Sequence, residues 1–180
     1  GVSQATGKTL SAENLLLSGS GNVALGVGQD VTTLASNTTG SIAMGVTAAP
    51  LTIGTVAGVS GIHNASGVSV TGAQSILIDQ SVSASGNITL AGGNGLTAGA
   101  TSNGIIIASV ARVISNGGDV ILDAGMAGNF INNRGADAVK AGGKWQVWAA
   151  GWTTVNNEQM TYSQFGSSAT DANTILRSGN

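Results

Sequence analysis

The chain has 180 residues, of which only 8% are charged and 42% are hydrophobic, with 29 glycines, one proline and no cysteine. Its formal net charge is −2 and its six basic residues are scattered, which argues against the clustered basic face of a nucleic-acid-binding protein. The lack of cysteine excludes disulfides and thiolate metal sites, and no apolar run reaches the length of a membrane-spanning helix. Low charge together with many aliphatic residues favours one folded domain over a disordered chain.

A short phrase recurs along the chain: glycine or another small residue, then Asn, Asp or Ser, then alternating apolar residues. It occurs, with variation, at 21–26 (GNVALG), 40–45 (GSIAMG), 67–72 (GVSVTG), 86–92 (GNITLAG) and 118–125 (GDVILDAG). Further short strands are expected at 15–19, 51–54, 76–79 and 105–109. Helical periodicity is scarce, and only residues 128–141 have room for a helical turn.

This self-similarity with variable insertions predicts an all-β fold, a parallel β-helix in which each rung takes about 20 residues. Rungs stacked about 4.8 Å apart would number roughly seven to nine. The low charge agrees with such a stack, because identical positions lie one rung apart and like charges would repel. The alternative all-β prediction is an antiparallel sandwich, which usually has aromatic core residues along its whole length.

All three tryptophans lie between Phe130 and Trp152, and residues 1–129 contain no Phe, Trp or Tyr. A thin β-helical core has little room for large rings, so we expect the aromatic segment to cover the end of the solenoid. Residues 1–129 are therefore predicted to form the rungs, and residues 130–180 the terminal rungs or cap of the same domain. Strand alternation places Trp145 on one face and Trp148 on the other.

Ligand contact is the other interpretation of this segment. An exposed tryptophan with charged neighbours is typical of sugar-binding sites, because the ring stacks on a pyranose face while charged groups bond the hydroxyls. The candidate interaction residues are Trp145, Trp148, Trp152, Arg134 and Lys144, with Asp137 and Lys140 close to them in the sequence.

Three other patterns have weak catalytic potential. TGKT at 6–9 resembles the end of a phosphate-binding loop but lacks its first glycine, and the single histidine, His63, has no metal-ligating partner and is expected in a polar turn. Asp119 and Asp123 flank a strand that would hold their Cα atoms about 13 Å apart, too far for a compact acid/base pair. We expect Arg112, one rung away, to pair with one of them.

Several of these phrases together resemble the filamentous haemagglutinin group, large exoproteins that Gram-negative bacteria export by two-partner secretion. The repeats GNITLAGG (86–93) and GGDVILDAG (117–125) and the phrase HNASGVSV (63–70) are similar to its rungs. The more specific phrase has the form F-x-N-x-x-G-A-D-A, then G-x-W-x-V-[YW]. Its positions here are Phe130, Asn132, Gly135, Ala136, Asp137, Ala138, Gly143, Trp145, Val147 and Trp148.

The resemblance implies a right-handed parallel β-helix that is secreted or lies on the cell surface and serves as an adhesin or its stalk. It implies an outer-membrane transporter as a partner of the parent exoprotein, and a host or surface glycan or protein as a ligand. SNGI at 102–105 lacks the proline of the family's N-terminal secretion motif, so we expect either a piece downstream of that domain or a diverged relative. We expect no enzyme activity, cofactor or metal; the alternatives are a self-assembling extracellular fibre subunit and, less favoured, a polysaccharide-acting enzyme.

Overall fold

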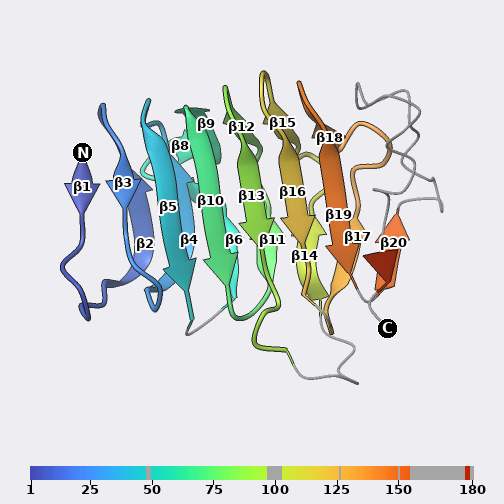
Figure 1. Ribbon diagram of the computed structural model, residues 1–180, viewed down its shortest axis with the longest axis horizontal. Coiled ribbons are helices and arrows are strands. Elements are labelled where there is room, and N and C mark those ends of the chain that lie inside the picture. Colours follow the sequence, from blue (N-terminus) through green and yellow to red (C-terminus); the bar gives the residue numbers. More distant parts are fainter. Residues whose placement is uncertain (48–49, 97–102, 126, 150, 155–176, 179–180) are drawn as a thin grey trace.

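The computed structural model describes residues 1–47, 50–96, 103–125, 127–149, 151–154 and 177–178 (Figure 1). This part of the chain is all-β, and its strands form two large sheets and one small hairpin. The first sheet has eight strands, in the order β1 (Val2–Ser3), β3 (Val23–Ala24), β5 (Ser41–Val46), β10 (Gly67–Gly72), β13 (Ile88–Ala91), β16 (Val120–Asp123), β19 (Trp145–Ala149) and β21 (Arg177–Ser178).

The second sheet has eleven strands. Ten follow the order β18 (Val139–Lys140), β15 (Val113–Ser115), β12 (Val82–Ala84), β9 (Ile62–Ala65), β4 (Asp30–Ser36), β6 (Leu51–Ile53), β11 (Ile76–Ile78), β14 (Asn103–Ile107), β17 (Asn129–Asn132) and β20 (Gly151–Thr154), while β2 (Ser11–Leu17) also pairs with β4. The strands β7 (Thr55–Val56) and β8 (Val59–Ser60) form a separate antiparallel hairpin. No helix within these described ranges is long and apolar enough to cross a membrane.

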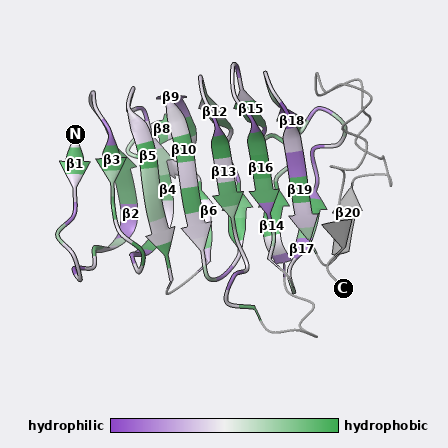
Figure 2. Ribbon diagram, viewed as in Figure 1, coloured by the Kyte–Doolittle hydropathy of each residue, from purple (hydrophilic) through white to green (hydrophobic). Residues whose placement is uncertain are grey.

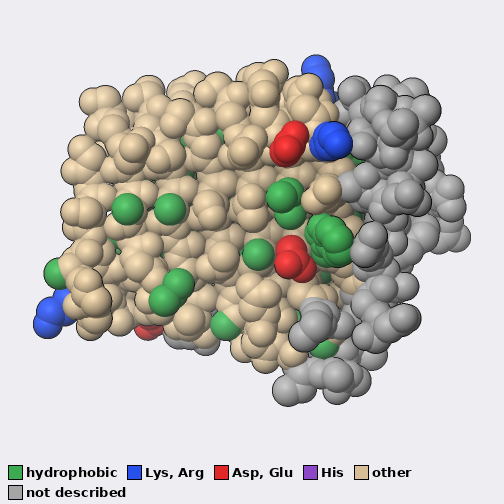
Figure 3. All heavy atoms as spheres, in the orientation of Figure 1, with side chains coloured by type: hydrophobic (Ala, Val, Ile, Leu, Met, Phe, Trp, Pro, Cys, Tyr) green, Lys and Arg blue, Asp and Glu red, His purple; other side chains and the backbone are tan. Residues whose placement is uncertain are grey.

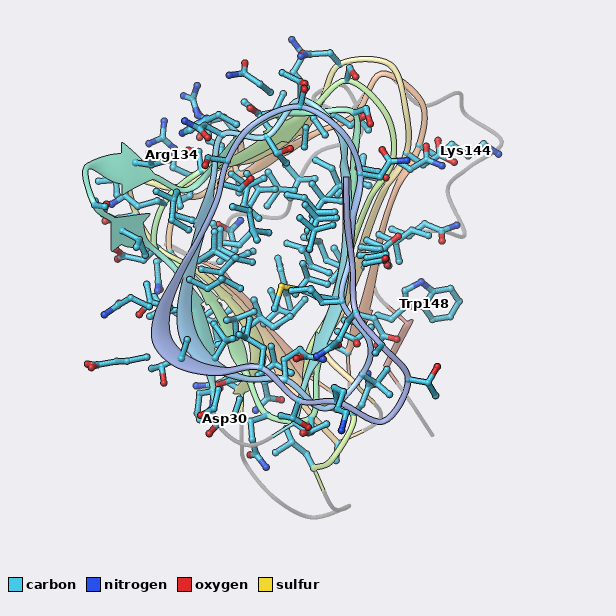
Figure 4. The ribbon with its side chains drawn as sticks, turned by 90° about the vertical axis from the view of Figure 1, so that its left-hand side faces the viewer. Asp30, Arg134, Lys144 and Trp148 are labelled. Carbon is cyan, nitrogen blue, oxygen red and sulfur yellow. The ribbon has the colours of Figure 1, made fainter. Side chains whose placement is uncertain are left out.

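The pairings within both large sheets are parallel. Each strand pairs with the corresponding strand of the next rung, and one such turn of the chain is called a lap below. Val68 in β10, for example, lies in register with Ile42 on one side and Ile88 on the other. A view along the long axis shows the two sheets facing each other across an interior filled by side chains (Figure 4). This arrangement is compatible with a β-solenoid and excludes the antiparallel sandwich.

The interior is built from columns of aliphatic side chains that repeat from lap to lap. One column consists of Val23, Ile42, Val68, Ile88, Val120 and Trp145, each in register with the next and at most 5% exposed. In strands such as β16, alternate residues are buried, and Figure 2 colours much of β13 and β16 as hydrophobic. All of these residues belong to one hydrophobic core.

In three copies of the recurrent phrase, the glycine is required by close contact between laps. A Cβ atom at Gly40 would lie 2.0 Å from the carbonyl oxygen of Gly21, and a Cβ atom at Gly86 would lie 2.4 Å from that of Ser66. Gly118 is equally crowded, since its Cβ would lie 2.5 Å from the backbone nitrogen of Asn87. At these turns into the first sheet, any larger residue would push successive laps apart.

The Asn or Asp that follows this glycine connects one lap to the next. The side-chain oxygen Oδ1 of Asn87 accepts the amide hydrogen of Asp119 at 2.9 Å, and Oδ1 of Asp119 accepts that of Lys144 at 2.8 Å. Asn22 does the same for Ser41 at 3.0 Å. These bonds satisfy backbone donors at, or one residue before, the start of a strand.

The strand predictions are confirmed in their positions. The five copies of the phrase become β3, β5, β10, β13 and β16, which are consecutive neighbours in the first sheet. The strands expected at 51–54, 76–79 and 105–109 become β6, β11 and β14 of the second sheet. The helical turn considered for 128–141 is wrong, because this fully described segment contains β17, β18 and a turn.

We expect Gly86→Ala to lower the free energy of unfolding by about 2 kcal/mol or more, because the added methyl group meets backbone that cannot rotate away. Gly67→Ala is the matched control: a Cβ there meets its nearest atom, the carbonyl oxygen of Asn87, at an ordinary 3.4 Å. Urea unfolding followed by circular dichroism measures both variants. Equal stability of the two would contradict the close-contact explanation.

Candidate functional site

The aromatic residues of the segment 130–152 are divided between the core and the surface. Phe130 is 0% exposed and Trp145 is 4% exposed, and both belong to the hydrophobic core. Phe130 follows Ile105 in register and Trp145 follows Val120, so each ring occupies a position that an aliphatic residue fills one lap earlier. The expectation that large rings do not fit inside is therefore wrong. Core positions of the later laps accept them.

Among the candidate tryptophans whose side chains the structure describes, Trp148 reaches the surface. It is 37% exposed and points outward from β19, opposite the buried Trp145 and Val147, as strand alternation predicted. In Figure 4 its ring lies outside the first sheet, on the same side as Lys144. Trp152 lies in β20 in register with Phe130, but its side chain falls outside the described residues.

The outward side chains of the first sheet are small along much of its length. Small outward residues stand in register across successive strands: Ala43, Ser69 and Thr89. In Figure 3, a basic side chain lies at the N-terminal edge of this face, and two acidic side chains, a further basic one and a large hydrophobic group gather toward its C-terminal end. Trp148 lies there next to Asp123, its register partner on β16.

Asp119 and Asp123 each accept a backbone hydrogen bond. Asp119 accepts the backbone N–H of Lys144, and Oδ1 of Asp123 accepts the N–H of Gly125 at 2.8 Å. The prediction that Arg112 pairs with one of them is wrong. Arg112 instead forms an ion pair with Asp137.

Asp137 is the centre of a small charge cluster that joins two laps. Its carboxylate accepts hydrogen bonds from Nε and Nη2 of Arg134, at 2.8 and 3.0 Å, and one from Arg112. Nη1 of Arg134 also donates to the carbonyl oxygen of Ser109 at 3.2 Å. Figure 4 places Arg134 far from Lys144 and Trp148, so the structure does not bring the predicted interaction residues into one site.

The cluster shifts two ionisation equilibria. The hydrogen bond from Arg134, helped by the positive charges of Arg112 and Arg134 and opposed by desolvation, lowers the pKa of Asp137 to about 2. The same hydrogen bond raises the pKa of Arg134. Because the Asp137 side chain is 52% exposed, solvent screens this pair and its contribution to stability is modest.

The remaining residues of the family-like phrase build the turn that holds Asp137. Asn132 is fully buried, and its Oδ1 accepts the N–H groups of Arg134 and Gly135, both at 3.0 Å. Its Nδ2 donates to the carbonyl oxygen of Gly135 at 2.8 Å. Gly135 has a φ of 94°, a conformation that favours glycine. The phrase is thus explained by a turn and by core packing.

The structure also locates two other sequence candidates, TGKT at 6–9 and His63. TGKT at 6–9 lines a hollow of about 400 Å³ beside Gln4 and Gly26, in the loop between β1 and β2, and no helix follows it in the described chain. His63 lies half-buried in β9, so the predicted polar turn is a strand there. Among the described residues, no group of three or more His, Asp or Glu side chains could hold a metal ion.

Sequence reasoning missed two adjoining hollows on the second sheet. One, of about 260 Å³, is lined by Asn64, Ala65, Ser83, Ala84, Ser85 and Asn116. The other, of about 220 Å³, is lined by Arg112, Ile114, Asp137, Val139 and Lys140. These residues come from three and two laps respectively, so only a correct alignment of the repeats would have brought them together.

No protein-family model matches the chain, and neither the curated proteins nor the solved structures contain a significant match.

We expect Trp145→Ala to lower the free energy of unfolding by about 3–5 kcal/mol, because it empties a core position. Trp148→Ala should cost less than about 2 kcal/mol, since that ring is already partly in solvent. Thermal and urea unfolding of both variants measures the difference. A larger loss for Trp148→Ala would mean that the ring supports the fold rather than a surface function.

The lowered pKa of Asp137 predicts a pH dependence with a definite sign. Its ionised form stabilises the fold above the ordinary pKa of 3.8, and this contribution is lost as the pH falls through about 2. Asp137→Asn should therefore cost at most about 1 kcal/mol near neutral pH, with the difference from the original chain shrinking toward pH 2. Asp79→Asn is the control, because Asp79 forms no ion pair within the described chain. A difference that is constant across this range would refute the assignment.

Proposed function

We propose that the chain is a rod-like module of a large secreted or cell-surface bacterial exoprotein of the filamentous haemagglutinin type, with an adhesive or stalk role. The observation that carries this proposal is the in-register parallel stacking of successive laps over the eight strands of the first sheet. Such stacking extends a protein in one direction, with side chains displayed at regular intervals along its faces. The resemblance of the repeats and of residues 130–148 to that group supports the same assignment.

We further propose that the fold is a right-handed parallel β-helix whose last laps are covered by the C-terminal segment. In Figure 4, seen from the N-terminal end, the chain descends through the first sheet, crosses below to the second and returns over the top. This path turns clockwise as it recedes, which supports the right-handed sense. The pairing of β21 with β19 supports a covering role for the segment, because Arg177 lies in register with Trp148.

An extracellular fibre subunit is the second candidate, and a feature of the N-terminal laps favours it. Within the described residues, β1 pairs only with β3, and β2 only with β4, so one edge of each strand is available to another chain segment. Val2 continues the inward column above Val23, yet it is 57% exposed. Strands from a second copy that paired with β1 and with β2 would extend both sheets.

Electron microscopy of the purified chain over a concentration series tests the module against the fibre. The proposed module gives separate short rods at every concentration, and Val2→Lys leaves them unchanged. An inward-pointing charge on an edge strand opposes strand addition. Filaments that grow with concentration, and that disappear in Val2→Lys, would refute the module and establish the fibre. Val27→Lys is the matched control, because Val27 is 83% exposed and lies outside the strands.

A further inference from the structure

The outer face of β9, β12, β15 and β18 contains a groove that crosses several laps. These strands are hydrogen-bonded neighbours, and Ser83, Ile114 and Lys140 stand in register along them. The two hollows described above are neighbours, because Ser83 of one and Ile114 of the other are register partners. The two neighbouring hollows together are called the groove.

The half of this groove toward the N-terminal laps is polar and uncharged. Its side chains come from Asn64, Ser83, Ser85 and Asn116, together with two alanines. Asn64, Ser85 and Asn116 are exposed, so their amide and hydroxyl groups face solvent. Amides and hydroxyls both donate and accept hydrogen bonds, which suits a ligand that carries many hydroxyl groups.

The other half is positively charged above an apolar floor. Arg112 and Lys140 line it with Ile114 and Val139, and the only acidic residue there, Asp137, is already shared by two arginines. The lining residues Arg112 and Lys140 against Asp137 leave a net charge of +1, and Arg134, which also binds Asp137, adds a further positive charge beside the hollow. Lys140 is exposed and forms no ion pair among the residues described. An anionic group is therefore attracted to this half.

We propose that the groove binds an acidic oligosaccharide along its length. The anionic groups of the ligand lie against Arg112 and Lys140, the apolar face of a sugar ring rests on Ile114, and hydroxyls bond to the neutral half. An acidic peptide matches the basic half, but it has no comparable hydroxyl groups for Ser83, Ser85 and Asn116. The inference goes beyond the proposed function, which leaves both the face and the ligand open.

Titration calorimetry of the full chain with tetragalacturonate at low ionic strength tests the proposal. We expect saturable binding that weakens as salt is added, and binding of neutral maltotetraose that is at least about tenfold weaker. Lys140→Gln should weaken tetragalacturonate binding at least about fivefold, because it removes an uncompensated charge from an exposed position. Asn116→Ala should weaken it as well, through the neutral half. Lys8→Gln, a charge lost outside the groove, should have no effect.

Three results would overturn the proposal. If the chain keeps its circular dichroism spectrum but shows no saturable binding of tetragalacturonate, the proposed site does not exist. The module proposal would be unaffected as long as electron microscopy shows separate rods. Tetraglutamate that binds as tightly as tetragalacturonate would show that charge alone is recognised, as in an acidic-peptide site. Binding that Trp148→Ala abolishes and Lys140→Gln does not would move the ligand to the first sheet.

Discussion

The fold depends on the close approach of each lap to the next. Neighbouring strands in a sheet lie about 4.8 Å apart, so every residue of one lap is within van der Waals reach of its counterpart in the next. This distance explains the glycines at Gly40, Gly86 and Gly118, where a single methyl group would strike backbone. It also explains why a side chain as short as that of Asn87 reaches an amide of the following lap. Sequence repetition is the direct consequence of this spacing.

The same spacing accounts for the scarcity of charge. A charged residue repeated in a column would face its own copies, while a neutral amide can bond to the next lap instead. The first charge in the column of Asn22 and Asn87 is Asp119, and it accepts a backbone N–H just as the amides do. Charged residues do gather around Asp137, but there they have opposite signs. The positive charges of Arg112 and Arg134 are partly neutralised by the Asp137 carboxylate.

The sequence predicted the strands well, because each depends on a local pattern that stacking enforces. The phrase beginning at Gly86 already contains the close-contact glycine, the bridging Asn and the inward Ile88. The site was predicted poorly, because residues near each other in the sequence need not share a face. Arg134 and Lys144 are ten positions apart and lie on different sides of the molecule. The expectation that large rings do not fit inside the core was also wrong, because no local sequence pattern gives the size of the core.

Phe130 and Trp145 occupy core positions rather than a ligand-binding surface. Up to Ile105 and Val120 the inward positions are aliphatic, and one lap later they are Phe130 and Trp145. Because these rings are in the core, they cannot themselves contact a ligand, and substituting them would disturb binding only through the fold. Recognition must then rest on outward residues. The second sheet supplies a groove with both charge and hydrogen-bonding groups, whereas Trp148 stands at the end of a face whose other outward residues are mostly small.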